Sequence, residues 1–303
     1  MKFHAMDTVL ILFYNTMWGA PLDVPEGLPA GCEITTDRSR YADAAAVVFH
    51  LPEWGRWRRL LLPPKRRGQL WVAWSMECER NYPLLLHPGF MRRFDLTMTY
   101  RQNSDIPLCY GSAYAETDFR NPPGPKKDYP PAAAFISSSA DSSGRRRYVR
   151  ELSHLIPLDS YGRFLRNRTL ARDQGRLTKL RTISGYKFTL AFENAVGVDY
   201  VTEKFYDPLL AGSVPVYLGA PNIDDFAPGE RCFINAADFP HPRALANYLS
   251  DLGNDGEAYR SYFAWKEQPF RPVFRKLMEC AAQHPFVRLC EMVRASRAGL
   301  RYR

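Results

Sequence analysis

The sequence predicts an α/β protein made of two doubly wound domains with parallel sheets, and three observations lead to this prediction. Short apolar segments rich in β-branched residues alternate with helical patterns along the chain. Several of these segments are apolar at successive positions, as expected for strands that are covered on both faces. A proline-rich stretch, 120–134, separates the two series of elements. Such alternation of strands and helices is typical of parallel sheets.

The composition is that of a folded globular protein long enough for two domains. Of the 303 residues, 46% are hydrophobic and 14% are aromatic, which excludes a disordered chain. No apolar run approaches the ~18–20 residues that a membrane-spanning helix needs. Residues 1–15 lack the order of charged, apolar and small residues that marks a signal peptide. We therefore expect a chain without a membrane anchor or a targeting segment of its own.

Each predicted strand is an apolar run that ends at polar or turn-forming residues. The predicted strands are 8–14, 44–51, 69–76, 96–100, 133–139, 186–192, 214–219 and 232–235. Helical patterns are clearest over 148–156 and 243–252. We interpret 120–134 as a linker, which gives domains 1–125 and 126–303; whether the last helix packs back on the first domain is left open. Open α/β sheets bind ligands at the carboxyl ends of their strands, which predicts a site in a cleft between the domains.

The net charge of +9 and the pI of about 9.3 favour an anionic partner. The basic residues are dispersed, however, and there is no zinc-finger or RNA-binding signature, so nucleic acid is not the expected partner. The glycine-rich dinucleotide and P-loop motifs are also absent, as are a C-x-x-C pair, a D-x-D pair and clustered histidines. We therefore expect no protein-held metal, and a bound diphosphate would be neutralised by cationic side chains and helix N-termini.

The first basic cluster of interest follows the predicted strand 133–139. A polar turn, 140–144, leads into a helix that opens with Arg145, Arg146 and Arg147. Three cations in a first helical turn oppose the helix dipole at roughly 0.3–1 kcal/mol each, an arrangement that makes sense beside an anion. The segment is thus a plausible phosphate site, although a solvated basic surface is the alternative.

A second cluster lies in the polar stretch 191–204, between two apolar segments. Thr202 is a good N-cap, with Glu203 and Lys204 at the first helical positions. Pro208 lies too deep for the first turn, so we expect the helix to kink or to begin late. Glu203 could accept hydrogen bonds from sugar hydroxyls and Lys204 could face an anion. The alternative is a capping motif with a solvated lysine.

A third cluster follows the predicted strand 69–76. Glu77 and Glu79 stand at its end and would share one face if the strand continued. One of the two carboxylates could then act as a general base. Glutamates often end strands without a catalytic role, so this alternative stays open.

These segments together resemble the α-1,3/α-1,4-fucosyltransferases, inverting GDP-fucose-dependent enzymes of the two-domain GT-B fold. The resemblance is densest over 186–222, which is similar to the donor-site signature of that family. Weaker matches occur in the family's order at 35–50, 68–81, 94–111, 145–162 and 261–266. The resemblance therefore covers most of the chain.

The resemblance implies a role for single residues. Glu77 matches the glutamate taken as the catalytic base, but the family's Glu-Ser-Pro is Glu77-Cys78-Glu79 here, which leaves Glu79 as a rival. Arg145 matches an arginine that contacts the donor diphosphate, whereas Arg146 and Arg147 have no assigned role. The donor-contacting positions of the signature fall on Asn194, Tyr200, Glu203 and Lys204, with Lys204 near the phosphates and Glu203 near the sugars.

The implied reaction is the transfer of L-fucose from GDP-β-L-fucose to a hydroxyl, expected to be O3, of a GlcNAc residue in a glycan. Residues 1–125 would bind the acceptor and carry the base, and 126–303 would bind GDP-fucose. No cofactor is expected, and a divalent metal would be at most stimulatory. The alternative is a catalytically inactive nucleotide- or glycan-binding protein of the same fold.

The resemblance leaves the setting of the enzyme partly open. Without the anchor and stem of secretory-pathway members, a cytoplasmic enzyme of bacterial type is expected, and a truncated Golgi lumenal domain is the alternative. Peripheral membrane contact through the basic surface, the oligomeric state, the acceptor and the choice between O3 and O4 are left open.

Overall fold

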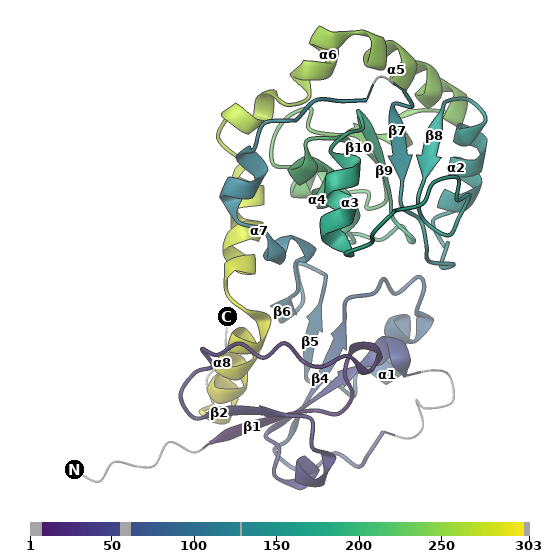
Figure 1. Ribbon diagram of the computed structural model, residues 1–303. Coiled ribbons are helices and arrows are strands. Elements are labelled where there is room, and N and C mark those ends of the chain that lie inside the picture. Colours follow the sequence, from purple (N-terminus) through teal and green to yellow (C-terminus); the bar gives the residue numbers. More distant parts are fainter. Residues whose placement is uncertain (1–7, 55–61, 128, 300–303) are drawn as a thin grey trace. The chain divides into compact units, whose positions relative to one another are not determined.

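The computed structural model describes residues 8–54, 62–127 and 129–299, and the chain divides into two compact units (Figure 1). Unit 1 comprises residues 1–109 and 280–303, and unit 2 comprises residues 110–279. Each unit is a parallel sheet with helices packed on both faces, so the predicted fold class, α/β with two parallel-sheet parts, is confirmed.

The sheet of unit 1 has the strand order β2-β1-β3-β4-β5-β6, with every neighbouring pair parallel. Its strands are β1 Val9–Phe13, β2 Cys32–Thr35, β3 Ala46–His50, β4 Leu70–Ser75, β5 Leu96–Thr99 and β6 Ile106–Pro107. The four predicted strands of this part of the chain are β1, β3, β4 and β5. Neither β2 nor β6 was predicted, because β2 is only half-buried at the sheet edge and β6 spans only 106–107.

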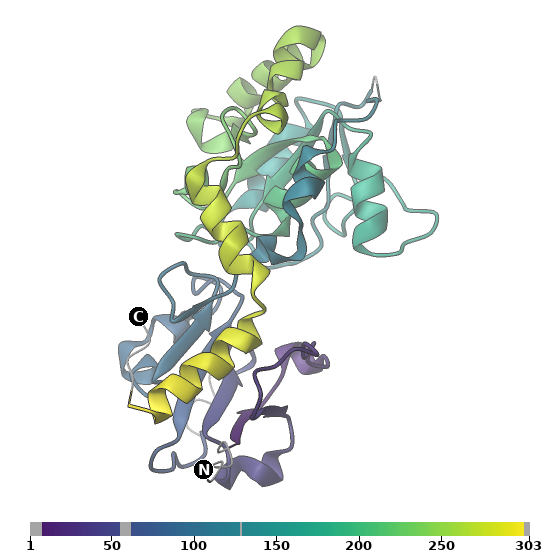
Figure 2. The same cartoon turned by 90° about the vertical axis from the view of Figure 1, so that its left-hand side faces the viewer.

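Helices cover both faces of this sheet. On one face α8 (Pro285–Arg297) buries Leu289, Cys290 and Val293 against β1, β3 and β4, and Figure 2 shows this helix lying across the sheet. Burial of Leu289 and of Val293 contributes roughly 1.5–3 kcal/mol each. The other face packs tryptophans and phenylalanines around α1 (Pro88–Met91). The 3₁₀ helices of this unit are η1 Met17–Gly19, η2 Arg38–Ala42, η3 Leu51–Glu53 and η5 Pro83–Leu86.

The sheet of unit 2 has the order β11-β10-β9-β7-β8 and is also parallel. Its strands are β7 Ala132–Ala134, β8 Leu158–Ser160, β9 Phe188–Phe192, β10 Val214–Leu218 and β11 Ile234–Asn235. The predicted strand 133–139 is too long, because the chain leaves the sheet after Ala134. The serine-rich remainder is a loop at the carboxyl edge.

Two helix layers enclose this second sheet. One face packs against α2 (Arg145–Ser153) and α5 (Pro242–Asn254), the other against α4 (Glu203–Ala211) and α7 (Pro272–Ala282). The two remaining α-helices described in this unit are α3 Arg176–Ile183 and α6 Gly256–Ser261. The described 3₁₀ helices are η6 Tyr110–Ala113, η7 Glu116–Arg120, η8 Ile223–Phe226, η9 Ala236–Asp238 and η10 Ala264–Glu267.

The proline-rich stretch 120–134 lies within unit 2, as does the predicted domain boundary at residue 125. Lys126 Nζ donates to the carbonyl oxygens of Ser184 (2.7 Å) and Gly212 (2.5 Å). The backbone N–H of Lys127 donates to Gly185 O at 2.7 Å. These bonds fasten the stretch along the surface of the unit.

The expectation that α4 begins late is wrong. The helix starts at Glu203, and the Thr202 side chain accepts a hydrogen bond from Lys204 N at 3.3 Å. Pro208 lies inside the helix, where it removes one backbone donor. Phe205, Tyr206 and Leu209 are buried, and this packing holds the turns around the proline.

No helix within the described ranges is both long enough and apolar enough to cross a bilayer.

We predict that Gly212→Ala destabilises the protein by more than the ~1–2 kcal/mol of left-handed strain alone. Gly212 ends α4 with φ 70°, and an added Cβ would lie 2.7 Å from Pro123 Cα. Gly144→Ala is the matched control, since φ is 73° there and nothing lies within 4 Å of the added Cβ. Urea unfolding measures both changes, and equal losses of stability would contradict the role of the Pro123 contact.

Candidate functional site

In unit 2, the loops that follow β7 and β9 are tied together at the carboxyl edge of the sheet. Ser143 Oγ donates to Glu193 O at 2.6 Å, and Ser143 N and Ser142 Oγ donate to Asn194 O at 3.2 and 3.4 Å. The turn before α2 and the polar stretch after β9 therefore form one continuous wall. It carries the predicted donor-site residues.

Arg145 lies at the start of α2 but does not extend into solvent. Its guanidinium is buried and donates to Phe192 O (3.0 Å), Ser138 O (3.4 Å) and Ala140 O (3.3 Å). Burial lowers the pKa of Arg145, and the nearby Glu193 carboxylate opposes that shift. The side chain thus ties the loop after β7 to the end of β9, and its predicted contact with a diphosphate stays a prediction.

The next two arginines of α2 have different surroundings. The Arg146 guanidinium lies 4.7 Å from the centre of the Phe164 ring, and Arg147 pairs with Glu151 at 3.8 Å on the exposed face. Both contacts are of the kind found on a solvated helix surface.

Lys204 is surrounded by oxygen atoms at the start of α4. Its Nζ lies 2.9 Å from Thr202 Oγ1, 3.2 Å from Glu203 Oε1 and 3.3 Å from Glu193 Oε2. Glu193 is fully buried, and its Oε1 accepts from Thr202 N at 2.8 Å and from Thr202 Oγ1 at 2.9 Å. Glu203 and Lys204 remain partly exposed.

The charges of this cluster are coupled. Burial raises the pKa of Glu193, and the Lys204 ammonium acts against that rise. Burial also disfavours the Lys204 ammonium, but Glu193 and Glu203 outweigh it, so the pKa of Lys204 is raised. For Glu203 the burial effect is outweighed by Lys204 and Lys179, so its pKa is lowered. Lys204 therefore keeps its positive charge well above neutral pH.

Asn194 and Tyr200 lie on either side of a tight turn. Both residues are buried, and Tyr200 O accepts a hydrogen bond from Tyr217 OH at 3.3 Å. Asp199 adopts φ 66°, and its N–H donates to Asn222 Oδ1 at 3.0 Å. Asn222 Nδ2 returns a bond of 2.9 Å to Asp199 Oδ1. This reciprocal pair compensates a backbone conformation that is unfavourable for a residue other than glycine.

In unit 1 the predicted carboxylates line a pocket at the carboxyl ends of β4 and β5. The Ser75 hydroxyl donates to Glu77 O at 3.0 Å and accepts from Glu77 N at 3.1 Å, which closes a turn directly after β4. The pocket has a volume of about 210 Å³ and contains both Glu77 and Glu79 in its lining. Cys78 between them is buried and is not part of the lining.

The two carboxylates of this pocket have different environments. Glu79 accepts hydrogen bonds from Tyr100 OH and from the Arg101 guanidinium, and its side chain is 12% exposed. Burial works against its charge, but Tyr100 and Arg101 outweigh burial and lower its pKa. A carboxylate engaged in this way is a weak base, and the assignment of the catalytic base to Glu77, with Glu79 as the rival, stays a prediction.

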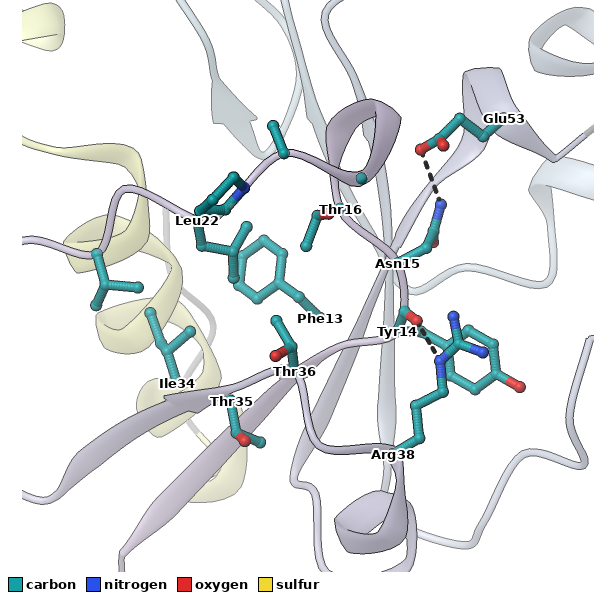
Figure 3. A pocket seen from close by; sticks show the side chains of 14 residues that line it. Phe13, Tyr14, Asn15, Thr16, Leu22, Ile34, Thr35, Thr36, Arg38 and Glu53 are labelled. Atoms are coloured by element: carbon teal, nitrogen blue, oxygen red, sulfur yellow. Dashed lines mark hydrogen bonds between the residues drawn. The ribbon is translucent and has the colours of Figure 1, made fainter.

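A larger pocket of unit 1, of about 760 Å³, lies at the carboxyl ends of β1 and β2 (Figure 3). Asn15 Nδ2 donates to Glu53 Oε2 at 3.4 Å, and Arg38 Nε donates to Tyr14 O at 2.7 Å. The Arg38 guanidinium also lies 4.4 Å from the centre of the Tyr14 ring. Aromatic and polar groups mixed in one hollow are typical of ligand pockets. Sequence reasoning missed this pocket, because its residues come from three distant segments.

The described parts of the chain contain no group of three or more His, Cys, Asp or Glu side chains suited to a metal ion. Three histidines instead cap helices: His87, His241 and His284 accept from backbone N–H groups at 3.1, 3.1 and 3.2 Å. His50 is buried, with Nδ1 2.8 Å from Glu53 Oε2. That no cofactor is required stays a prediction.

Two family models together match most of the chain. Glycosyltransferase family 10 (fucosyltransferase), C-terminal part, matches residues 125–302. The N-terminal fucosyltransferase model matches residues 6–111.

Among curated proteins, α-(1,3)-fucosyltransferase B of Drosophila melanogaster is 35% identical over 263 residues, which cover 81% of this chain and 59% of that protein. The human 4-galactosyl-N-acetylglucosaminide 3-α-L-fucosyltransferase FUT6 is 36% identical over 278 residues, 85% of this chain and 73% of that protein. Canine GDP-fucose protein O-fucosyltransferase 3 is 36% identical over 220 residues, which cover 67% of this chain and 46% of that protein. The chain thus spans about half the length of several curated relatives.

Solved structures agree with the fold. A crystal structure of an α1,3-fucosyltransferase with GDP-fucose has a TM-score of 0.55 at 18% identity and covers 84% of this chain and 81% of that one. A second α1,3-fucosyltransferase structure has a TM-score of 0.54 at 17% identity and covers 87% of this chain and 82% of that one. The GT-B fold class expected from the sequence is confirmed.

We predict that Arg145→Lys lowers the free energy of unfolding by about 2–4 kcal/mol, because one ammonium cannot reproduce hydrogen bonds to three separated carbonyl groups. Arg146→Lys is the matched control and should cost less than about 1 kcal/mol, since it changes only a contact with Phe164. Urea denaturation followed by circular dichroism measures both variants. Equal losses of stability would contradict the linking role of Arg145.

Proposed function

Because the chain belongs to glycosyltransferase family 10, the fucosyltransferases, we propose that it transfers L-fucose from GDP-β-L-fucose to a GlcNAc-containing glycan. The observation that carries this proposal is the Thr202-Glu203-Lys204 cluster at the start of α4, on the carboxyl edge of a parallel sheet. Such edges bind nucleotides, and a helix N-terminus with a cation suits a diphosphate. A solved α1,3-fucosyltransferase of similar fold was crystallised with GDP-fucose, which supports the donor.

The proposed donor site is built from the predicted residues of unit 2. Lys204 neutralises the diphosphate together with the N–H groups of α4. The partly exposed Glu203 accepts hydrogen bonds from ribose or fucose hydroxyls. Asn194 and Tyr200 contact the donor from the turn between β9 and α4. Arg145, through its three carbonyl bonds, fixes the wall that carries these groups.

The proposed chemistry is a single displacement. Glu77 removes the proton of an acceptor hydroxyl while the oxygen forms a bond to the anomeric carbon of fucose. The bond between that carbon and the diphosphate oxygen breaks, and GDP leaves with the bonding electron pair. Lys204 stabilises the negative charge that grows on the leaving diphosphate. The configuration at the anomeric carbon inverts, and no covalent enzyme intermediate forms.

The acceptor is proposed to bind unit 1, with the reacting hydroxyl in the pocket lined by Glu77. Relatives at similar identity are named for different acceptors: a galactosyl-GlcNAc glycan for FUT6 and protein hydroxyls for protein O-fucosyltransferase 3. We propose transfer to O3 of GlcNAc. The larger pocket beside β1 would hold further sugar residues of the glycan.

The test is incubation with GDP-fucose and a panel of GlcNAc, N-acetyllactosamine and serine- or threonine-containing peptides. GDP release measures turnover, and NMR of the product gives the linkage. The expected product is an α1,3-fucosylated glycan, and it should also form in EDTA, since a metal is proposed to be stimulatory at most. Transfer only to peptides would overturn the acceptor assignment, and GDP binding without transfer to any acceptor would support an inactive binding protein. A cytoplasmic location, with a Golgi lumenal domain as the alternative, stays a prediction.

We predict that Glu77→Gln reduces kcat at least ~100-fold, the scale of a lost general base, while the affinity for GDP is unchanged. Glu79→Gln removes the partner of Tyr100 and Arg101, so its main effect should be on stability. Steady-state kinetics and calorimetric titration with GDP separate the two. Abolished turnover in Glu79→Gln together with activity in Glu77→Gln would reverse the assignment.

We predict that Lys204→Ala weakens GDP binding by about 10- to 100-fold, because a charge-assisted bond to phosphate contributes roughly 1.5–3 kcal/mol. Lys187→Ala is the control, since Lys187 Nζ donates to Gly253 O at the opposite end of β9. Its affinity for GDP should equal that of the unmodified protein. An unchanged affinity in Lys204→Ala would refute the diphosphate assignment.

A further inference from the structure

Three oxygen atoms lie around the Lys204 ammonium, and they are not equivalent: Thr202 Oγ1 and Glu203 Oε1 accept hydrogen bonds from Nζ, whereas Glu193 Oε2 forms an ion pair with it. Thr202 Oγ1, Glu203 Oε1 and Glu193 Oε2 lie within 3.3 Å of Nζ. The Thr202 hydroxyl accepts from Lys204 N and Nζ, so its own hydrogen is directed to the Glu193 carboxylate. Glu193 therefore accepts every described hydrogen bond between it and Thr202, and it forms an ion pair with Lys204. This is the arrangement of an ionised carboxylate.

The two carboxylates differ in their freedom to leave Lys204. The Glu203 side chain is 41% exposed and can turn toward a hydroxyl of a ligand. The Glu193 side chain is 0% exposed and is fastened by Thr202 N at 2.8 Å. Its stem is also confined, because a Cβ added to Gly219 would lie 2.7 Å from Glu193 Cγ. Glu193 therefore cannot reach a ligand, yet it stays beside the lysine.

We propose that Glu193 is a positioning residue for donor binding: it holds the Lys204 ammonium in place and keeps it charged at the start of α4. This inference rests on the proposed role of Lys204 toward the donor diphosphate. Glu193 itself contacts neither donor nor acceptor. Its effect reaches the nucleotide only through Lys204 and Thr202.

The charges around the cluster explain why Lys204 needs such a partner. On α2 the buried Arg145 acts against the Lys204 charge, and burial acts in the same direction. On α3 the Lys179 ammonium also interacts with the Glu203 carboxylate, so Glu203 is shared between two lysines. On β10 the buried Tyr217 stays neutral, because burial and Glu193 raise its pKa. When Glu203 turns to a ligand, Glu193 is the acidic side chain of this cluster that remains on Lys204.

These contacts determine how donor binding depends on pH. A lysine whose pKa is raised stays charged to higher pH, so binding through Lys204 should not depend on pH between about pH 7 and pH 9. Glu193→Gln keeps the size of the side chain and removes its charge. Burial and Arg145 then lower the pKa of Lys204, and donor binding must take up a proton.

The test compares GDP affinity by calorimetry at about pH 7 and pH 9 in the unmodified protein and in Glu193→Gln. We expect affinities within ~3-fold at the lower pH and an additional loss of at least ~10-fold in the variant at the higher pH. The guanine base of GDP can itself lose a proton at the higher pH, and the pH dependence measured for the unmodified protein corrects for this. Glu203→Gln is the matched control: it also removes a carboxylate from Lys204 but leaves Glu193, so its curve should run parallel to that of the unmodified protein.

A second variant tests the same proposal through rescue. In Glu193→Gln with Lys204→Arg, the guanidinium cannot deprotonate, so the additional loss at pH 9 should disappear. If Glu193 had only a structural role, Glu193→Gln would weaken GDP binding by the same factor at both pH values, and Lys204→Arg would not restore it. Either result would overturn the proposal. Should Glu193→Gln not fold, ¹³C NMR of labelled lysine in the unmodified protein decides, because a Lys204 pKa below the ordinary value would refute it. Absence of GDP binding by the unmodified protein would instead refute the proposed function.

Discussion

The structure of unit 2 depends on the way it buries charge. Arg145 and Glu193 are almost completely removed from water at one edge of a sheet, where an unpaired ion would cost several kcal/mol. Hydrogen bonds to rigid groups compensate the cost of burying each charge. Arg145 donates to backbone carbonyl groups, and Glu193 accepts from the backbone N–H and the hydroxyl of Thr202. These bonds define where the loops after β7 and β9 lie, and they leave Lys204 and Glu203 as the charges that reach the surface.

A second buried carboxylate anchors the same helix further along. Asp207, on α4, is fully buried and accepts from Lys179 at 2.8 Å, Arg176 at 3.0 Å and Tyr114 OH at 3.0 Å. Burial and the Asp207 charge raise the pKa of Tyr114, which keeps the phenol a hydrogen-bond donor. The helix is thus held at its first turn and at its middle, and Pro208 follows directly after this second anchor. A helix fixed twice can present Lys204 in one orientation despite the proline.

How far the sequence predicts this structure follows from what each residue contributes locally. Long apolar runs identified β1, β3, β4, β9 and β10, because strands covered on both faces carry an unmistakable pattern. The edge strands β2 and β8 lack it, since Cys32–Thr35 is half-buried and Leu158–Ser160 contains two polar residues. Thr202 was identified as a cap from its type and position. Glu203 and Lys204 were likewise expected at the first helical positions, but the late start inferred from Pro208 is wrong, because the packing of Phe205 and Tyr206 outweighs the local effect of the proline.

For the site, sequence patterns located the polar segments but could not assign a depth to each side chain. Glu193 and Glu203 are the same residue type in one polar stretch, yet the Glu193 side chain is fully buried and the Glu203 side chain is 41% exposed. Glu77 and Glu79 are likewise the same residue type at one strand end. Tyr100 and Arg101, which directly follow β5, bind Glu79, and no spacing within 74–83 could reveal those partners. Partners that arrive from a neighbouring strand therefore fix the environment of a carboxylate such as Glu79, and this is why residue type alone locates the polar segments without assigning a role to each side chain.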